Sequence, residues 1–235
     1  MDTREFLRRY AYVYLYVAAF FLLGAGLLRH SVEVSSDQRF PERRVIIIDA
    51  GHGGPDGGTT GVAGTGEAEL NLQIARRLER LLTLFGCDTV MTRKDSGSLA
   101  TEGDTIRRKK QSDLRNRVEM VNAVPNGILV SIHQNHYPDG RYYGPQVFYS
   151  GEAEPLARTM QSSLTDVLAP GSRRAAKEAS GIFLMEHIRH PGILVECGFL
   201  SNADEEQRLR TEKHQKRLAA VMASVLAGYV SQNAA

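Results

Sequence analysis

Three runs of apolar residues constrain the fold of this chain more than any other feature. They are VIIIDA (45–50), GILVSIH (127–133) and GILVECGF (192–199). A half-exposed strand alternates polar and apolar residues, whereas a continuous apolar strand is buried on both faces. Such strands are typical of parallel sheets covered by helices on each side. The runs therefore predict an α/β architecture.

Helical patterns alternate with these strands. Leu70, Ile74 and Leu78 recur at helical spacing within 67–85, and Gly86 is suited to end that helix. Further helices are expected around 114–121, over 154–168 and, as one long closing helix, over about 204–229, with an irregular polar loop over 94–112.

Two more strands are expected at CDTVMTR (87–93) and PQVFYS (145–150), the second near a sheet edge because of Pro145. Alternation of strands and helices predicts a single three-layer αβα domain with a mostly parallel central sheet.

The N-terminus carries a separate signal. Tyr10–Leu28 is 19 residues long without a charge, and as a helix it would span about 28 Å, close to the thickness of a bilayer core. Arg4, Arg8 and Arg9 precede the segment and Arg29 follows it, so the rest of the chain is expected outside the cytoplasm. We expect a transmembrane signal anchor in residues 1–30, a linker over 31–42 and one domain over 43–235. A cleaved signal peptide, followed by secretion, is the alternative.

Charge and cysteine content exclude two classes of protein. The formal net charge of the 235-residue chain is +2, so no field of the whole protein favours nucleic acid as a partner. Two cysteines, Cys87 and Cys197, are too few for a disulfide framework. Both lie in apolar segments, and we expect buried free thiols.

Polar side chains gather at the ends of the predicted strands. His52 follows the first apolar run, His133 ends another, Glu196 interrupts the last, and Glu67 opens the first helix. Open α/β sheets bind ligands at the carboxyl ends of their strands, so these four residues are expected to converge. Two histidines and a carboxylate are the ligand set of a catalytic zinc.

Each residue also has a structural interpretation. A glutamate in a first helical turn interacts with the helix dipole, and a histidine among glycines can serve a turn. Glu196 is harder to explain in this way, because a carboxylate in a core strand is usually paired or functional.

Four ordered motifs give the chain a family resemblance. IDAGHGG (48–54), the glutamate fifteen residues after His52, LVSIHQN (129–135) and ILVECGFLSN (193–202) resemble the zinc-dependent N-acetylmuramoyl-L-alanine amidases of bacterial cell walls, the type 3 amidases. The likeness runs from about Val45 to the C-terminus. Smaller matches to family patterns are Arg93, Arg117 with Asn122, and Arg174 with Lys177.

The resemblance implies a reaction and roles for individual residues. His52, Glu67 and His133 would bind Zn²⁺, and Glu196 would be the catalytic carboxylate. Arg174 and Asn135 would contact the substrate. The reaction would be hydrolysis of the amide that joins the lactyl group of N-acetylmuramic acid to L-alanine in peptidoglycan.

The resemblance also suggests a biological role. Beside the matched region only the N-terminal apolar segment stands out, an organisation similar to that of the amidases that tailor spore cortex for muramic-δ-lactam formation in endospore formers. The basic stretch 106–117 strengthens that likeness, although a solvated loop explains it as well. A vegetative or autolytic amidase and a non-catalytic peptidoglycan-binding protein are the alternatives. An activating partner protein is a further expectation. A zinc carboxypeptidase is disfavoured, since it needs a closer His and Glu pair than His52 and Glu67.

Overall fold

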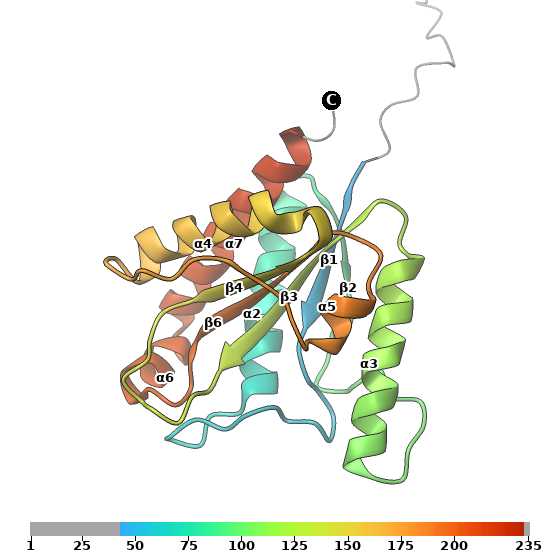
Figure 1. Cartoon of the computed structure of the whole chain (residues 1–235), viewed down its shortest axis with the longest axis horizontal. Coiled ribbons are helices and arrows are strands. Elements are labelled where there is room, and N and C mark those ends of the chain that lie inside the picture. The colour runs from blue at the N-terminus through green and yellow to red at the C-terminus, as the bar shows by residue number, and fades with distance from the viewer. Residues whose placement is uncertain (1–42, 233–235) are drawn as a thin grey trace, which may run out of the picture. The chain divides into compact units, whose positions relative to one another are not determined.

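A six-stranded sheet lies at the centre of residues 43–232, the part of the chain that the computed structural model describes (Figure 1). The spatial order of the strands is β2-β1-β3-β6-β4-β5. Their bounds are β1 Val45–Ala50, β2 Asp88–Met91, β3 Gly127–Asn135, β4 Gln146–Ser150, β5 Lys177–Glu178 and β6 Gly192–Phe199.

Most of this sheet is parallel. β1 pairs in parallel with both β2 and β3, and β3 pairs in parallel with β6. β4 runs antiparallel to β6, and only the two-residue β5 lies beyond it, parallel to β4. The segment with Pro145 thus lies next to the sheet edge, as expected.

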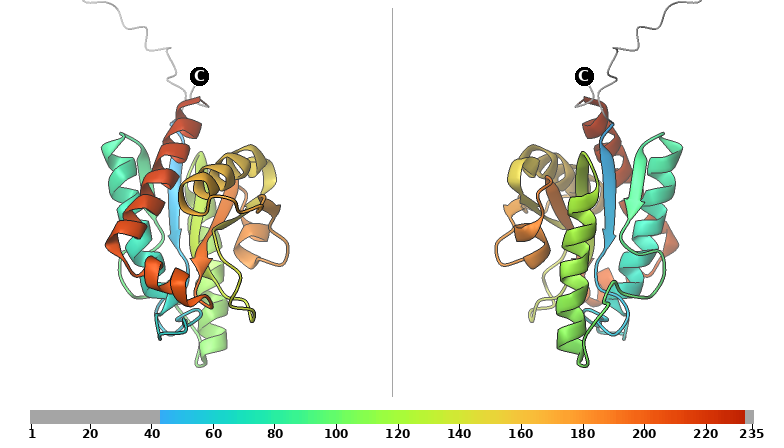
Figure 2. Two further views of the ribbon diagram at one scale, coloured as in Figure 1. Left: turned by 90° about the vertical axis from the view of Figure 1, so that its left-hand side faces the viewer. Right: turned by 90° about the vertical axis from the view of Figure 1, so that its right-hand side faces the viewer.

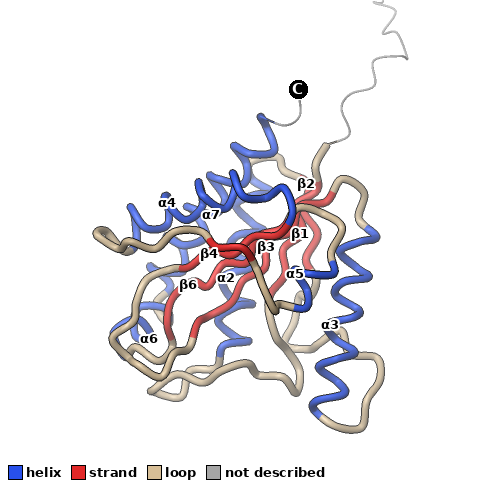
Figure 3. The backbone as a smooth tube through the Cα atoms, viewed as in Figure 1, coloured by secondary structure: helices blue, strands red, loops and turns tan. Residues whose placement is uncertain are grey.

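Helices cover both faces of the sheet (Figure 3). One face packs against three long helices, α2 Glu67–Leu84, α4 Glu154–Leu168 and α7 Glu212–Gln232, and α7 lies beside α2 (Figure 2). The other face packs against α3 Ile106–Ala123 and the short α5 Phe183–His187. Two short elements complete the domain, η1 Gly151–Ala153 and α6 Ala203–Leu209.

The two faces differ in the size of their apolar cores. Alternate side chains of a strand point to opposite faces, so Ile46 and Ile48 join the large core beneath α2, α4 and α7. Ile47 joins a much smaller cluster beneath α3 and α5. The face beneath α3 and α5, which has the smaller apolar core, is thinly covered and leaves room for polar side chains.

His133 and Glu196 belong to that thinly covered face. Leu129 and Leu194 point into the small cluster, and the same alternation directs His133 and Glu196 to the same side farther along their strands. The parallel pairing of β3 and β6 places the two residues directly opposite each other. The expected convergence of strand ends is therefore built into the sheet register.

Two expectations about helices are wrong. The segment 94–112 is not loop throughout, because α3 begins at Ile106. Thr105 caps it, its hydroxyl accepting a hydrogen bond from the Arg108 backbone N–H, and Arg108 also pairs with Asp104. The basic stretch 106–117 is therefore helical rather than a loop. Its first turns are solvent-exposed and carry no apolar periodicity.

The predicted closing helix is also two helices. α6 ends at Leu209 and α7 begins at Glu212. The hydroxyl of Thr211 accepts a hydrogen bond from the His214 N–H, while the Thr211 N–H donates to the Arg208 carbonyl. Thr211 thus starts a new helix where no glycine or proline marks a break.

The predicted N-terminal segment and linker lie outside the described residues. Within 43–232 no helix combines the length and apolar character needed to cross a membrane. Both cysteines are free, as expected. Cys197 is buried, whereas Cys87 lies just before β2 and is only half-buried.

Candidate metal centre and active site

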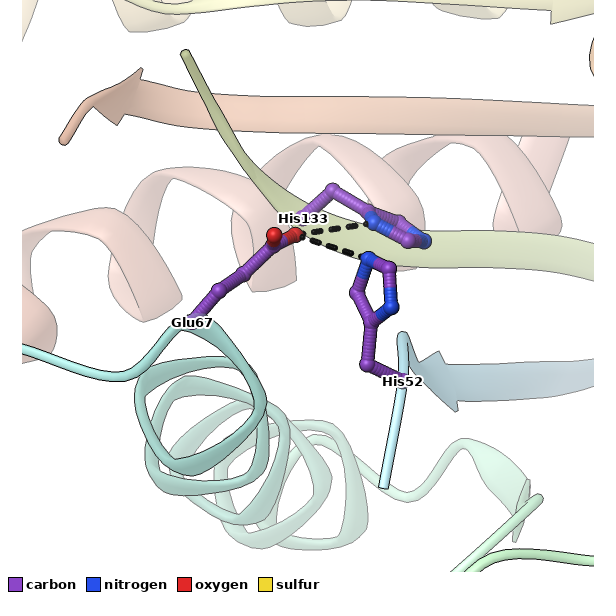
Figure 4. Close-up of side chains that lie close together, drawn as sticks. All are labelled: His52, Glu67 and His133. Atoms are coloured by element: carbon purple, nitrogen blue, oxygen red, sulfur yellow. Dashed lines mark hydrogen bonds and ion pairs between the residues drawn. The ribbon is translucent and has the colours of Figure 1, made fainter. Parts of the chain in front are cut away.

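Three side chains from three different elements meet at one end of the sheet (Figure 4). His52 comes from the loop after β1, Glu67 is the first residue of α2, and His133 lies near the end of β3. Their donor atoms all lie within 4.8 Å of one another. The structure thus brings together the three ligands that the sequence predicts.

The spacing of these donors fits a small cation. Nε2 of His52 lies 3.3 Å and Nδ1 of His133 lies 3.1 Å from Oε1 of Glu67. Ligands about 2.0–2.2 Å from a tetrahedrally coordinated metal lie roughly 3.3–3.6 Å from one another. Two imidazoles and one carboxylate at this spacing fit Zn²⁺ with a fourth position open.

Neighbouring polar groups hold the Glu67 carboxylate firmly. Oε1 accepts hydrogen bonds from the backbone N–H of Gln134 at 3.1 Å and from the Asn71 side chain at 3.3 Å. Oε2 accepts one from the backbone N–H of Thr59 at 2.8 Å. Burial alone would raise the pKa of Glu67, but hydrogen bonds from His133 and His52 outweigh it and hold that pKa far below its usual range. Glu67 is therefore ionised, the state in which a carboxylate can bind a metal.

His52 has an unusual backbone and a fixed ring. Its φ is 61°, in the left-handed region, a conformation that costs a non-glycine residue about 1–3 kcal/mol. Nδ1 of its ring lies 2.9 Å from Oδ2 of Asp56, which Lys110 approaches at 3.2 Å. A carboxylate on one imidazole nitrogen orients the other toward a metal, a common arrangement in metalloenzymes.

Two glycines make the space in which the ligands meet. A methyl group at Gly51 would lie 2.2 Å from Nε2 of His133. One at Gly58, whose φ is 70°, would lie 2.5 Å from Oε2 of Glu67. No side chain fits at either position, which explains two of the glycines that follow β1.

Glu196 lies beside this cluster in an opposite environment. Among the described residues its buried Oε2 has no hydrogen-bond partner. Burial raises the pKa of Glu196 to about 7, and the charge of nearby Glu67 adds to the effect while the two histidines oppose it. A carboxylate with this pKa exchanges a proton near neutral pH, which is what a general base and acid requires.

A cavity of about 350 Å³ opens directly onto the cluster. His52 and His133 form one side of it, and α3 and the segment around α5 form the other. Its remaining walls are both apolar and charged, including Leu114, Ile182 and Lys110. A substrate can therefore reach the candidate metal site from the thinly covered face of the sheet.

Comparison with known proteins agrees with this geometry. The family model for N-acetylmuramoyl-L-alanine amidase matches residues 46–227, which include all four site residues.

The chain belongs to the N-acetylmuramoyl-L-alanine amidase family.

Similar proteins support the assignment. The germination-specific N-acetylmuramoyl-L-alanine amidase of Bacillus subtilis (strain 168) is 38% identical over 180 residues, covering 75% of each chain. The CwlD amidase from Clostridioides difficile, solved in complex with the GerS lipoprotein, has a TM-score of 0.77 and 34% identity, covering 80% of this chain and 99% of that one. The catalytic domain of CwlV from Bacillus (Paenibacillus) polymyxa var. colistinus has a TM-score of 0.67 and 28% identity, covering 80% of this chain and 98% of that one. This chain is therefore a peptidoglycan amidase.

The two predicted substrate contacts of the amidase remain predictions. The Arg174 guanidinium lies over the Phe199 ring, with Cζ 4.7 Å from its centroid, and donates to the Tyr143 carbonyl at 3.1 Å. Asn135 ends β3, two residues after His133, and its carbonyl accepts a hydrogen bond from the Leu200 N–H.

Sequence reasoning missed the groups that hold the amidase's candidate ligands. Asp56 orients His52, and Asn71 supports Glu67. The position of Asp56, four residues after His52 within a glycine-rich loop, was a usable signal. Asn71 lies one helical turn after Glu67 and was equally accessible as an i, i+4 pair.

Proposed function

We propose that this amidase is zinc-dependent and that Glu196 is its general base and acid. His52, Glu67 and His133 would hold Zn²⁺, which when bound polarises the substrate carbonyl and lowers the pKa of a water molecule. Glu196 takes a proton from the attacking water as the oxygen of that water bonds to the carbonyl carbon. Glu196 then gives that proton to the amide nitrogen, and the bond to L-alanine breaks.

One observation carries this proposal. Glu196 lies opposite His133 across one register pair of parallel strands, with a buried oxygen that has no partner among the described residues. An unpaired buried oxygen is costly in a structural residue. Beside three donors at zinc-like spacing, an oxygen without a partner is expected of a group that must take a proton from the attacking water.

The test uses purified protein and defined muropeptides. Metal-free protein should release no L-alanine peptides, and stoichiometric Zn²⁺ should restore hydrolysis. Full activity in chelator-treated protein with no detectable metal would contradict zinc dependence.

We also propose that the amidase acts on spore cortex, removing stem peptides ahead of muramic-δ-lactam formation. The support is the 38% identity to a germination-specific amidase, together with the likeness to CwlD. Muropeptide analysis of a deletion strain tests this role. Cortex without muramic-δ-lactam is the expected result. Normal cortex with chained vegetative cells would favour the alternative of an autolytic amidase.

We propose that residues 1–30 anchor the amidase in the membrane with its catalytic domain over 43–235 on the outer side. The support is the uncharged segment Tyr10–Leu28 and the arginines before it. Full-length protein should fractionate with membranes and be sensitive to external protease. A mature N-terminus between Ser31 and Phe40 would show instead that the segment is a cleaved signal peptide.

A partner protein is a further part of the proposal. The CwlD amidase was solved in complex with the GerS lipoprotein. We propose that this amidase likewise binds a lipoprotein, and that the lipoprotein activates it. Affinity purification from sporulating cells, followed by turnover assays with and without the recovered lipoprotein, tests it. Unchanged turnover in the presence of every co-purifying lipoprotein would contradict activation.

A further inference from the structure

Two buried arginines hold the backbone that carries His52. Arg117, from α3, is 1% exposed, and Arg93, just after β2, is 5% exposed. Arg117 donates to the Ala50 carbonyl at 2.9 Å and to the His52 carbonyl at 2.7 Å. Arg93 donates to the Ala50 carbonyl at 2.8 Å and to the Gly51 carbonyl at 3.0 Å.

These contacts solve a local problem of the fold. β1 ends at Ala50, so the carbonyl groups of residues 50–52 lie where the chain leaves the sheet. Buried carbonyl groups require donors. The planar guanidinium can donate in several fixed directions at once, which suits it to three successive carbonyls.

The same contacts act where the backbone is strained. His52 has a φ of 61°, in a region that residues other than glycine adopt uncommonly. Glycine would relieve the strain but cannot bind a metal. A histidine held in this conformation therefore needs outside support, and strained residues of this kind persist only where their surroundings fix them.

Carboxylates in turn fix Arg117. It pairs with Asp49 and, at 2.7 Å, with Asp113 one helical turn earlier. The buried residues of α3 are Ser112, Asp113, Arg117 and Val121, so this helix docks largely through polar groups. Lys110 on the same helix adds a second link through Asp56 to the His52 ring.

We propose that Arg117 and Arg93 are positioning residues for His52, holding the carbonyl groups of residues 50–52 so that the imidazole stays aimed at the metal. The two arginines thus set the orientation of the His52 side chain before the metal binds. Without the contacts of either guanidinium, the loop can leave the left-handed conformation at His52. Zinc binding must then restore that conformation, so the affinity for zinc falls.

The experiment measures zinc affinity of the full-length protein by competition with a chromophoric chelator, well below the unfolding temperature. Arg117→Lys keeps the positive charge between Asp49 and Asp113 but cannot reach both acids and two carbonyls. Arg93→Lys removes carbonyl contacts from a residue that forms no ion pair with any residue of 43–232. We expect each variant to bind zinc about 10–100-fold more weakly, the loss typical when support for a metal ligand is removed.

Two matched controls separate positioning from general stability. Arg115→Lys makes the same replacement on an exposed part of α3, where Arg115 pairs with Glu102. Val121→Ala weakens the packing of α3 without touching the loop. We expect both controls to bind zinc within about twofold of wild type, although Val121→Ala lowers the melting temperature of the metal-free protein.

Two results would overturn the proposal. One is zinc affinity within threefold of wild type in Arg117→Lys and Arg93→Lys. The other is an equal loss in Val121→Ala at equal loss of stability. If Arg117→Lys does not fold, Arg93→Lys decides alone. The inference rests on the proposed zinc dependence, but the failures differ: wild-type protein that binds no zinc refutes zinc dependence, whereas tight wild-type binding with unaffected arginine variants refutes only positioning.

Discussion

The first turn of α2 and the strand β6 each present a glutamate to the same small space, and the two surroundings are opposite. Glu67 meets two imidazoles, two N–H groups of the backbone and the Asn71 amide. Glu196 has a buried oxygen with no partner among the described residues. The pKa of Glu67 is held far below the usual range, while that of Glu196 is raised to about 7. These opposite environments support the proposed roles, in which Glu67 is a metal ligand and Glu196 carries the proton.

The largest expected effect comes from removing a ligand on the Glu67 side. His133→Ala should lose zinc at equimolar metal and fall to background turnover, because the electrophile and the activated water disappear together. Elemental analysis of the purified variant measures the loss. Full zinc occupancy in this variant would show that His133 is not a ligand.

Removing the proton carrier has the next largest effect. Glu196→Gln should keep its zinc and its fold and lose turnover by about 10²- to 10⁴-fold, since the amide has nearly the same shape but accepts no proton. Steady-state kinetics on a defined muropeptide measures this. Near-normal turnover would mean that another group takes the proton.

A smaller effect is expected from a residue that contacts one of the proposed ligands without itself binding the metal. Asp56→Asn should weaken zinc binding by about 10- to 100-fold, because the amide no longer fixes the His52 ring as a carboxylate does. Asp104→Asn, an exposed carboxylate that pairs with Arg108, is the control and should bind like wild type. Equal affinities for zinc in the two variants would remove Asp56 from the account.

The smallest effect concerns stability of the metal-free protein. The pKa of Glu196 rises from 4.5 to about 7 on folding, so the folded state binds more protons than the unfolded state in that window. The free energy of unfolding therefore falls as pH rises through it, by at most about 1.4 kcal/mol per pH unit from this group. Below a pH of about 4.5, Glu196 is protonated in both the folded and the unfolded state and does not change the free energy of unfolding.

Glu196→Gln removes that contribution. The difference in unfolding free energy between wild type and variant, from urea titrations at pH 5 and pH 8, should shift in favour of the variant at the higher pH. A difference that stays constant over this range would contradict the raised pKa.

The sequence predicted the sheet and the ligand cluster for the same physical reason. Continuous apolar runs that alternate with helical patterns favour a parallel sheet covered on both sides, and the carboxyl ends of such strands meet at one edge. His52 and His133 follow directly from that rule. The β4 segment was placed near the edge because Pro145 precedes it.

The features that sequence missed are those without periodic signals. The first turns of α3 are exposed, so no apolar residues at helical spacing indicated a helix before Ser112. The break at Thr211 contains neither glycine nor proline. Arg93 and Arg117 could be matched to family patterns, but their contacts are to backbone carbonyls of residues 50–52. Such contacts depend on three-dimensional placement and leave no pattern of side chains in the sequence.

The contrast between the two glutamates is tested most directly by one paired measurement. Zinc affinity by calorimetry and turnover on a defined muropeptide are determined on the same preparations of Glu67→Gln and Glu196→Gln, beside wild type. The account predicts that Glu67→Gln loses zinc binding and turnover together, whereas Glu196→Gln binds zinc as wild type does and loses turnover alone. Parallel loss of zinc in both variants, or retention of zinc in Glu67→Gln, would contradict the division of roles between α2 and β6.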